Sequence, residues 1–354
     1  MRAPTNVPFR TAIVGAGRIA EEHLKFVARS PFAELVGVCD LDPILAQRAV
    51  QGTGAVATDD LDRILAELRP DVVHVLTPPR HHEPVVRAAL AHGVRRLVVE
   101  KPVGLDLLST ERMIAGVQDA GGRLTEDHNY RFNAPVESLV LEVGSGRLGE
   151  VREVTVRMAM PLAETRYRYA PERREASALA GGVLGEFLPH LAYLILAFLP
   201  QARVVSNRWG KSDPANDLEH DAIDAVVEQP GSSASGRIIF SSNVAPSTTS
   251  VTVRGSRGWA EADLQNPCLR VSRARPLGPQ LSPLVDQLVG SLALARAAGS
   301  GLSAKLRGPA IYSGIGVFLE QTYVAWQEGL QPPVTHNDVI ETARLVGELA
   351  AGAA

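Results

Sequence analysis

Lys101 is the first residue in this chain whose type and position could do chemistry. It follows the apolar run 97–99 and Glu100, and it precedes Pro102. An amine at the end of a buried strand can exchange a proton with a reacting oxygen if its surroundings lower its pKa from the usual value of about 10.4. Glu100 could hold the ammonium group or cap the local backbone. The alternative for Lys101 is a solvated surface lysine.

Glu186 and His190 form a second candidate pair. They are four residues apart within a helical pattern over 182–198, and a helix would place both side chains on one face. Histidine can give or take a proton near neutral pH, and a carboxylate can orient it. The alternative is an exposed ion pair, worth roughly 0.3 to 0.5 kcal/mol. A zinc site is not expected, because further ligands at suitable spacing are missing from the sequence.

A glycine-rich turn separates a predicted strand over 9–14 from a helical pattern that begins at Ala20. Gly15 would permit the tight turn, and Gly17 would let the backbone approach a pyrophosphate closely. The first N–H groups of the helix would then face the phosphates. We therefore expect a dinucleotide to be held here by Gly15, Ala16, Gly17, Arg18 and Ile19.

Asp40 ends a second predicted strand over 35–39, at about the offset that a dinucleotide site requires, roughly 20 residues on. Its carboxylate could accept both hydroxyls of an adenosine ribose, whereas a 2′-phosphate would meet a like charge. NAD is therefore favoured over NADP. The alternative is that Asp40 caps the next helix, near Pro43, and carries no information about the cofactor.

The elements that must position these residues alternate up to residue 127. Further strands are expected over 71–76 and 96–100, with an edge strand at 124–127 and helices over 60–68, 83–91 and 107–120. This alternation predicts a parallel sheet, and ligands bind at the carboxyl ends of such strands. Thr77, Pro78 and His82 lie at one of these ends and are expected to border the cofactor. His82 could instead cap the helix that follows it.

The pattern changes from residue 129 onward. Apolar residues alternate over 149–160, and short apolar runs separated by turn residues follow, which predicts an antiparallel sheet. We expect two domains, 1–128 and 129–354. The helices over about 309–351 could pack back on the first of them.

Composition excludes several classes of protein. The chain has 354 residues and a formal net charge of -3. Its composition therefore lacks the excess of basic residues that binding nucleic acid requires. No apolar stretch reaches the roughly 18 to 20 residues of a membrane span, and the first ten residues lack an apolar signal core. We expect a cytoplasmic protein that binds neither nucleic acid nor a membrane.

Taken in order, these motifs resemble the Gfo/Idh/MocA family of NAD(P)-dependent oxidoreductases over essentially the whole chain. The matching segments are 15–20, 77–82, 100–102, 129–132 and 181–186 with His190. The resemblance implies a Rossmann domain followed by an α+β domain with an open, mostly antiparallel sheet, a homodimer or homotetramer formed through that sheet, and a nicotinamide close to Lys101. One residue departs from the family pattern, because Glu186 stands where an aspartate is usual.

Residues of the second domain are candidates for binding a small-molecule substrate. Asn129, Tyr130 and Arg131 could contact the nicotinamide ribose or the substrate, although a hinge salt bridge is an equal alternative for Arg131. The segment 165–174 holds four arginines and two tyrosines. With Arg166 and Arg168, it suits an anionic or nucleotide-linked substrate. The alternative is a solvated loop that neighbouring glutamates neutralise.

The leading hypothesis is a dehydrogenase or reductase acting on a secondary alcohol or ketone of a polyol, sugar or sugar derivative. Lys101 and His190 would exchange the proton, and Glu186 would orient His190 or the substrate. One alternative within the resemblance is an NAD-assisted glycoside hydrolase. A catalytically silent dinucleotide-sensing regulator is the contrasting class, and reduction of an imine or other double bond remains open.

Overall fold

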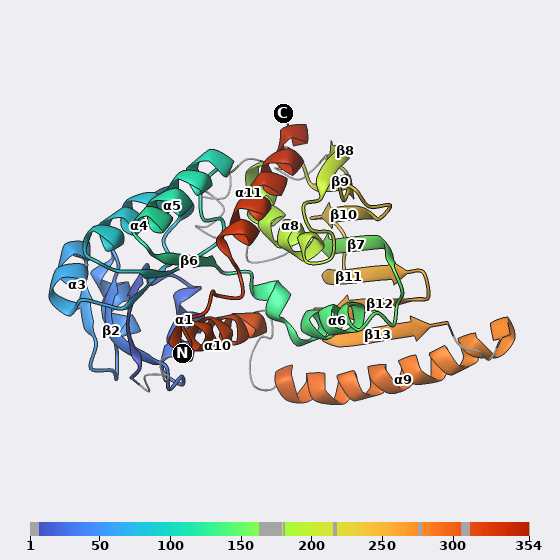
Figure 1. Ribbon diagram of the computed structural model, residues 1–354, viewed down its shortest axis with the longest axis horizontal. Coiled ribbons are helices and arrows are strands. Elements are labelled where there is room, and N and C mark those ends of the chain that lie inside the picture. The colour runs from blue at the N-terminus through green and yellow to red at the C-terminus, as the bar shows by residue number, and fades with distance from the viewer. Residues whose placement is uncertain are drawn as a thin grey trace. The chain divides into compact units, whose positions relative to one another are not determined.

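The structure of the protein is a computed structural model that describes residues 7–162, 179, 181–214, 218–274, 278–305 and 312–353. Arg166 and Arg168 lie outside these residues. The chain divides into two compact units. The first unit comprises Met1–Asn129 and Ile315–Arg344, and the second comprises Tyr130–Gly314 and Leu345–Ala354. Figure 1 labels many of the helices and strands of both units.

The first unit is built on a six-stranded parallel sheet in the order β3-β2-β1-β4-β5-β6. Its central strands are valine-rich and buried on both faces, as parallel strands covered by helices are. The strand order reverses between β1 and β4, and ligands bind at such switch points. The strands are β1 (Phe9–Val14), β2 (Ala33–Cys39), β3 (Val56–Thr58), β4 (Val72–Val75), β5 (Arg96–Val99) and β6 (Arg123–Glu126).

The predicted parallel sheet is confirmed, including the edge strand β6. Our sequence analysis missed β3, which has only three residues and pairs with β2 alone at the other edge. So short a strand leaves no alternation of buried and exposed residues to detect.

Five helices follow the strands of this sheet, and aspartates begin three of them. Asp42 begins α2, because its Oδ1 accepts the Ile44 N–H at 2.9 Å. Asp60 caps α3, and Asp106 forms a capping box with Ser109 at α5. The alternative in which Asp40 caps α2 is therefore wrong. The helices are α1 (Ala20–Val27), α2 (Pro43–Ala49), α3 (Leu61–Leu68), α4 (His82–Ala91) and α5 (Leu107–Asp119).

The C-terminal helices α10 (Ser313–Gln327) and α11 (His336–Ala350) return to this sheet with residues 315–344. Thr125 Oγ1 donates to the Val334 carbonyl at 2.9 Å, and the Leu124 N–H donates to His336 Nε2 at 3.1 Å. These two contacts attach the returning segment to β6. On α10, the hydroxyl of Tyr323 reaches β1 and β4.

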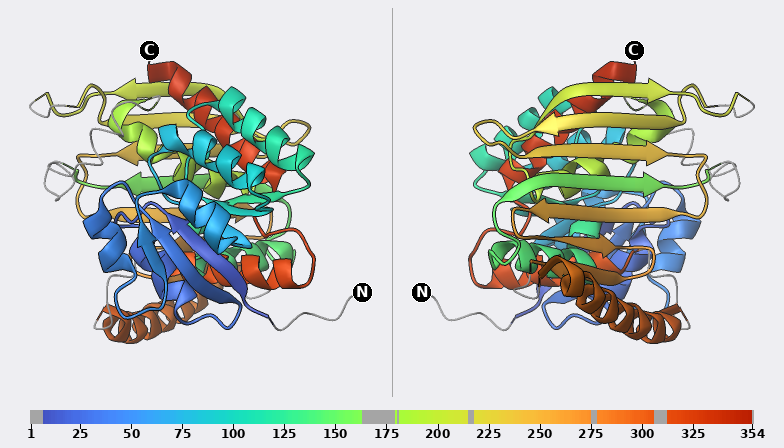
Figure 2. Two further views of the ribbon diagram at one scale, coloured as in Figure 1. Left: turned by 90° about the vertical axis from the view of Figure 1, so that its left-hand side faces the viewer. Right: turned by 90° about the vertical axis from the view of Figure 1, so that its right-hand side faces the viewer.

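The second unit holds a seven-stranded sheet in the order β13-β12-β11-β7-β10-β9-β8, whose strands lie side by side in the right-hand view of Figure 2. All neighbours are antiparallel except β7 and β10, which confirms the expected mostly antiparallel sheet. The strands are β7 (Val151–Ala159), β8 (Arg203–Gly210), β9 (Ala222–Glu228), β10 (Ser235–Ser241), β11 (Thr248–Gly255), β12 (Gly258–Asp263) and β13 (Cys268–Arg273).

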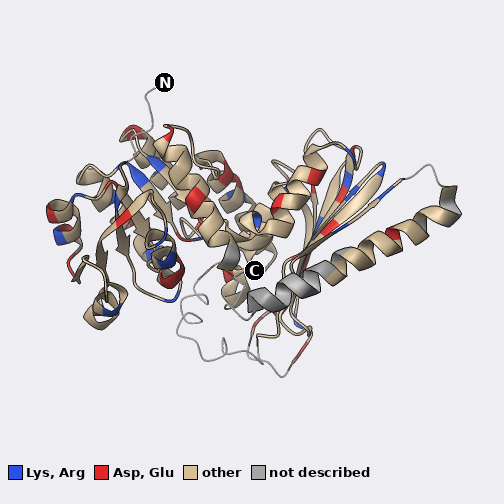
Figure 3. Ribbon diagram, turned by 90° about the horizontal axis from the view of Figure 1, so that it is seen from below, with Lys and Arg blue, Asp and Glu red and all other residues tan. Residues whose placement is uncertain are grey.

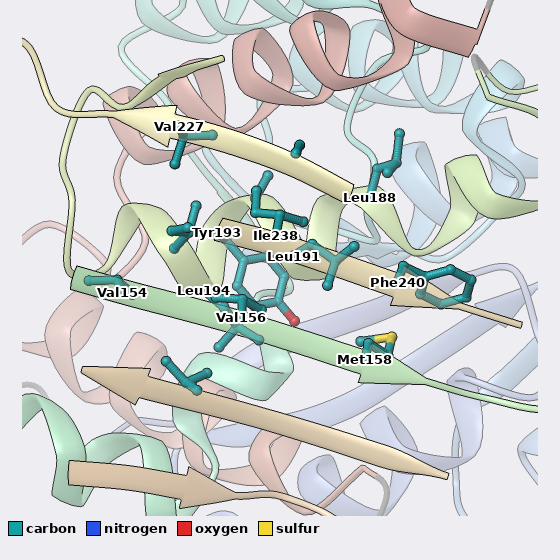
Figure 4. Packing of buried hydrophobic residues seen from close by; sticks show 14 of the residues in the cluster. Val154, Val156, Met158, Leu188, Leu191, Tyr193, Leu194, Val227, Ile238 and Phe240 are labelled. Carbon is teal, nitrogen blue, oxygen red and sulfur yellow. The ribbon is translucent and has the colours of Figure 1, made fainter. Parts of the chain in front are cut away.

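One face of this sheet packs on helix α8 (Leu188–Leu196). Val154, Val156 and Met158 of β7 are fully buried there, and Leu191 and Leu194 of α8 lie in the same cluster, as Figure 4 shows. Burial of this apolar surface anchors α8, which carries a functional candidate, His190. The unit also contains α6 (Ala134–Gly144) and α9 (Gly278–Lys305). Within the described residues, no helix combines the length and the apolarity that crossing a membrane needs.

Candidate functional site

The glycine turn between β1 and α1 has the geometry of a phosphate cradle. Gly15 has φ +99°, and a Cβ there would lie 2.7 Å from the backbone C and O atoms of Leu76. Only glycine therefore fits without a backbone shift. A Cβ on Gly17 would meet no heavy atom within 4 Å. The exposed side of the turn thus leaves open space in which a pyrophosphate could approach the backbone, and the residues present fit a dinucleotide.

Asp40 braces this turn. Its Oδ2 accepts the Ala16 N–H at 2.6 Å, and its Oδ1 accepts the Asp42 N–H at 2.8 Å. Charge-assisted hydrogen bonds of this kind are roughly twice as strong as neutral ones. The carboxylate therefore has a structural role that the sequence did not reveal, in addition to the ribose contact that stays a prediction. Arg18 is exposed beside the turn, and Ile19 is half-buried.

The loop after β4 contributes a buried hydroxyl. Thr77 Oγ1 is buried and has no hydrogen-bond partner within the part of the chain that the structure describes. Thr77 follows Leu76, whose backbone touches the Gly15 position, and Pro78 is exposed. An orphaned donor next to the cradle is consistent with a ligand that completes its hydrogen bonding.

His82 is the first residue of α4, and its ring is fully buried. Nε2 lies 2.7 Å from the Thr77 carbonyl oxygen, and Nδ1 lies 3.1 Å from those of Pro102 and Val103. Burial lowers the pKa of His82, and the three carbonyls and Glu126 oppose this shift. The capping role is wrong, since the ring braces the loop after β4 against the loop after β5. That Thr77, Pro78 and His82 border a cofactor stays a prediction.

Lys101 lies between the loops that follow β4 and β6, and it is half-buried. The backbone on both sides of it is fixed, because the Glu100 N–H donates to Val75 O at 2.9 Å and the Val103 N–H donates to Glu126 Oε1 at 2.9 Å. A lysine held in this way at a strand end is a better candidate for chemistry than one on a solvated loop.

Asp127 follows β6 and is buried close to Lys101. Burial raises the pKa of Asp127 well above its usual value, the charges of Glu100 and Glu126 add to this, and Lys101 acts in the opposite direction. Its Oδ2 lies 3.9 Å from His23 Nε2. Lys101 therefore lies among three acidic side chains, those of Glu100, Glu126 and Asp127, at the tips of β5 and β6.

In the second unit, two glycines introduce the segment that carries Glu186 and His190. Gly181 has φ +83°, and a Cβ there would lie 2.7 Å from Trp209 Cη2. The segment is not one helix as expected. A 3-10 turn, η4 (Gly182–Glu186), ends at Glu186, and α8 begins at Leu188 with Pro189 in its first turn. The single helix expected over 182–198 is therefore wrong, because the helical repeat is interrupted at Phe187, and the shared face of Glu186 and His190 stays a prediction.

His190 is held between two tyrosines and is 7% exposed. The Tyr130 ring stacks on the imidazole at a centroid distance of 4.5 Å and an interplanar angle of 19°. The Tyr193 hydroxyl lies 2.7 Å from His190 Nδ1. Burial, with the charges of Tyr312 and Glu186, raises the pKa of Tyr130 to about 12, so this phenol is neutral at physiological pH.

The remaining candidates are placed as follows. Asn129 is buried at the end of the first unit, and Tyr130 and Arg131 open the second. Arg131 is half-buried in η2 (Asn129–Phe132). Among the described residues, no group of three or more His, Cys, Asp or Glu side chains could hold a metal ion.

Comparison with known proteins identifies the family. A model described as the oxidoreductase family with an NAD-binding Rossmann fold matches residues 9–128, and a model of the GFO/IDH/MocA C-terminal domain matches residues 142–261. The chain belongs to the Gfo/Idh/MocA family. The resemblance and the Rossmann fold predicted from the sequence are confirmed.

Several curated relatives in this family are dehydrogenases. D-glucoside 3-dehydrogenase of Escherichia coli (strain K12) is 33% identical over 157 residues, which make up 44% of this chain and 44% of that protein. Inositol 2-dehydrogenase of Rhizobium meliloti (strain 1021) is 26% identical over 266 residues, 73% of this chain and 76% of that protein. The chain thus aligns with less than half of the glucoside dehydrogenase but with most of the inositol dehydrogenase.

Solved structures share the fold over nearly the whole chain. The WlbA dehydrogenase from Bordetella pertussis in complex with NADH and UDP-GlcNAcA has a TM-score of 0.78 at 21% identity, covering 99% of this chain and 96% of that one. An oxidoreductase from Agrobacterium radiobacter in complex with NAD+, L-tartaric acid and magnesium has a TM-score of 0.79 at 15% identity, with 98% and 96% covered.

Two residues that surround the candidates were not predicted from the sequence, Tyr193 beside His190 and Asp127 beside Lys101. For His82, a predicted site residue, the bracing role was not predicted. A signal existed only for Asp127, which is an acid at the carboxyl end of the strand next to that of Lys101.

Proposed function

We propose that the chain is an NAD-dependent dehydrogenase or reductase of a polyol, sugar or sugar derivative. Hydride would move between C4 of the nicotinamide and the carbinol or carbonyl carbon of a secondary alcohol or ketone. The observation that carries the proposal is the open, glycine-bounded turn at Gly15 and Gly17, braced by Asp40, in a family defined by NAD binding. Relatives named as glucoside and inositol dehydrogenases support the substrate class.

The first unit would hold the dinucleotide. The carboxylate of Asp40 favours NAD over NADP, because a 2′-phosphate there would meet a like charge. Oδ1 and Oδ2 each retain a lone pair beyond their backbone contacts, so Asp40 could also accept from a ribose hydroxyl. The residues proposed for this role are Gly15, Ala16, Gly17, Arg18, Ile19, Asp40, Thr77, Pro78, His82, Glu100 and Lys101.

Proton exchange with the substrate oxygen is assigned to Lys101 and His190. A bound nicotinamide supplies only the hydride acceptor or donor, so the protein must handle the proton. Glu186 would orient His190 or the substrate, and Asn129, Tyr130 and Arg131 would contact the substrate or the ribose. Arg166 and Arg168 would favour an anionic or nucleotide-linked substrate by bidentate hydrogen bonds.

The test is a titration followed by a turnover assay with the full chain. NADH and NADPH are titrated by fluorescence, and NAD with a panel of inositols, glycosides and UDP-sugars is then followed at 340 nm. We expect NADH to bind more tightly than NADPH, and we expect the absorbance at 340 nm to increase with at least one substrate. NADH binding without turnover over the whole panel would favour the regulator. Glycoside cleavage that needs NAD but causes no net absorbance change would favour the hydrolase.

We also propose that the chain forms a homodimer or homotetramer through the outer face of the seven-stranded sheet. This face carries both charges, with Arg237 bound to Asp224 at 2.6 Å and Arg254 near Glu153 at 4.0 Å, so it can be complementary to its own copy. Sedimentation of the wild type and of Arg237→Asp tests the assembly, because a like-charge cluster at the interface would dissociate it.

Helix α9 lies beside β13 and adds exposed apolar surface to the same unit. Figure 3 shows that its described part carries few charges, and Leu288 is 67% exposed. Exposed apolar surface of this kind is typical of an interface between subunits. Leu288→Glu should therefore also reduce the sedimentation coefficient, and an unchanged coefficient would remove α9 from the proposed assembly.

A further inference from the structure

The hydroxyl of Tyr193 joins two groups of the second unit. It accepts the Tyr130 backbone N–H at an N···O distance of 3.1 Å, and it lies 2.7 Å from Nδ1 of His190. Tyr193 is 2% exposed and sits three residues after His190 on α8, with the two rings edge to face at 5.6 Å. The contact with His190 is buried and the contact with the Tyr130 N–H is partly buried.

The direction of the first hydrogen bond constrains the second. A backbone N–H can only donate, so the phenol oxygen acts as the acceptor toward Tyr130. Accepting one hydrogen bond polarises a hydroxyl and strengthens its own donation. The distance of 2.7 Å to Nδ1 also matches a hydroxyl donor better than a ring N–H donor, for which about 2.9 to 3.0 Å is usual. The geometry therefore favours a Tyr193 hydroxyl that donates to Nδ1.

We propose that Tyr193 is a positioning residue that fixes neutral His190 as the tautomer protonated on Nε2. A neutral imidazole carries one proton, and an Nδ1 that accepts from Tyr193 leaves that proton on Nε2. His190 then presents a hydrogen-bond donor, not a base, to the substrate oxygen. The inference rests on the proposed function and narrows one part of it, because Lys101 alone then exchanges the proton while His190 donates a hydrogen bond.

The chemical consequence concerns alcohol oxidation. The proton of the alcohol O–H group would pass to the amine of Lys101, and a bound nicotinamide would accept the hydride from the C–H bond as the C=O bond forms. Throughout, the Nε2–H of His190 donates to the substrate oxygen and keeps its proton. In ketone reduction the same donor polarises the carbonyl, and the Lys101 ammonium returns the proton.

The surroundings hold the imidazole in one orientation. The Tyr130 ring covers one face of it nearly in parallel, and the Tyr130 backbone N–H sets the hydroxyl of Tyr193. Tyr193 contacts the imidazole directly, and Tyr312 and Glu186 act electrostatically on Tyr130. The ring orientation and the tautomer are thus fixed by the same two tyrosines.

The decisive experiment observes the tautomer without any turnover. The full chain is labelled with 15N histidine, and the ring nitrogens of His190 are assigned by the signals that His190→Gln lacks. Spectra are recorded at a pH where the imidazole is neutral. We expect a protonated, pyrrole-type Nε2 and a pyridine-type Nδ1 in the wild type, and in Tyr193→Phe a mixture of both tautomers. A protonated Nδ1 in the wild type overturns the inference, and so does an unaltered tautomer in Tyr193→Phe.

A matched control separates this effect from loss of a buried hydroxyl. Tyr323→Phe removes the same atom from a buried tyrosine of the first unit, and it should leave the His190 signals unchanged. If Tyr193→Phe fails to fold, the wild-type spectrum alone decides. On the substrate identified above, Tyr193→Phe should lower kcat at least about tenfold with little change in KM. A panel without any turnover defeats the proposed function, while the spectra still decide the tautomer.

Discussion

The carboxylate of Asp40 and the backbone N–H of Ala16 are joined by a hydrogen bond of 2.6 Å, which ties the end of β2 to the glycine turn after β1. An acid at this position in a dinucleotide site is usually considered for the ribose alone. Here it also shapes the loop that would receive the pyrophosphate. Changes at Asp40 should therefore affect both the shape of the site and its choice of cofactor, and two variants can separate these effects.

Asp40→Asn should change the cofactor preference while the conformation of the glycine loop is largely kept. The amide oxygen can still accept the Ala16 N–H, but the negative charge that opposes a 2′-phosphate is gone. We expect the ratio of the NADPH and NADH dissociation constants to fall at least about fivefold. Asp40→Ala should in addition lose the brace, and NADH affinity should drop at least about tenfold. Fluorescence titration of both cofactors checks this, and an unchanged ratio in Asp40→Asn would falsify the ribose assignment.

The two glycines of the turn should respond differently to alanine. Gly15→Ala forces a Cβ against the backbone of Leu76 and Thr77 at positive φ, so the free energy of unfolding should fall by about 1 to 3 kcal/mol or more. Gly17→Ala has open space around the new methyl group and should change it by less than about 1 kcal/mol. NADH affinity should nonetheless drop at least about tenfold in Gly17→Ala. Urea unfolding and NADH titration measure the two effects, and normal NADH binding by a stable Gly17→Ala protein contradicts the cradle.

Two buried histidines of the first unit should make stability depend on pH. His23 and His74 share a hydrogen bond of 2.9 Å between their Nδ1 atoms, and His74 Nε2 lies 2.9 Å from the Tyr323 hydroxyl, which also contacts Thr11. Burial lowers the pKa of His23 from 6.5 to about 3, and burial and the charge of His23 lower that of His74. Between pH 6.5 and 3 the unfolded chain binds protons that the folded chain excludes, so stability falls as the pH falls.

The size of this effect is measurable with one variant. Each such histidine contributes up to about 1.4 kcal/mol per pH unit in the window below pH 6.5. The raised pKa of Asp127 changes the stability in the opposite direction as the pH falls. The variant is therefore compared with the wild type at each pH. His23→Gln should reduce the slope of the unfolding free energy against pH by about the contribution of one bound proton, roughly 1.4 kcal/mol per pH unit. His92→Gln, which changes a partly exposed histidine, should keep the wild-type slope, and equal slopes in all three proteins would refute the account.

The sequence predicted the first sheet well because its signals are local. Buried strands of valine and isoleucine end at turn residues, and the glycine turn and Asp40 follow at fixed offsets. The break between η4 and α8 was not predicted, although Pro189 is a signal of a helix start. Apolar residues follow a helical periodicity both before and after residue 187. The interruption at Phe187 therefore leaves no change in the sequence pattern.

The candidate residues of the site could be predicted from the sequence, but the residues that surround them could not. Lys101 and His190 stand out by residue type and by motif, but their neighbours are set by tertiary contacts. Asp127 reaches Lys101 because β5 and β6 pair in register, and Tyr130 reaches Tyr193 across 63 residues of chain. Hydrogen bonds of this kind depend on distances of a few tenths of an ångström, and neither composition nor periodicity encodes them.

Lys101 offers the most direct test of the proposed chemistry. Lys101→Met removes both the charge and the proton acceptor. Lys101→Arg keeps a cation near Asp127, but a guanidinium group does not give up its proton at the pH of an enzyme assay. Both variants should therefore lower kcat by at least about 100-fold, with NADH affinity close to that of the wild type. Lys25→Met changes a lysine whose side chain is 54% exposed and should retain full turnover. Activity of Lys101→Arg near the wild-type level would mean that the site needs the charge of Lys101 but no proton transfer through it.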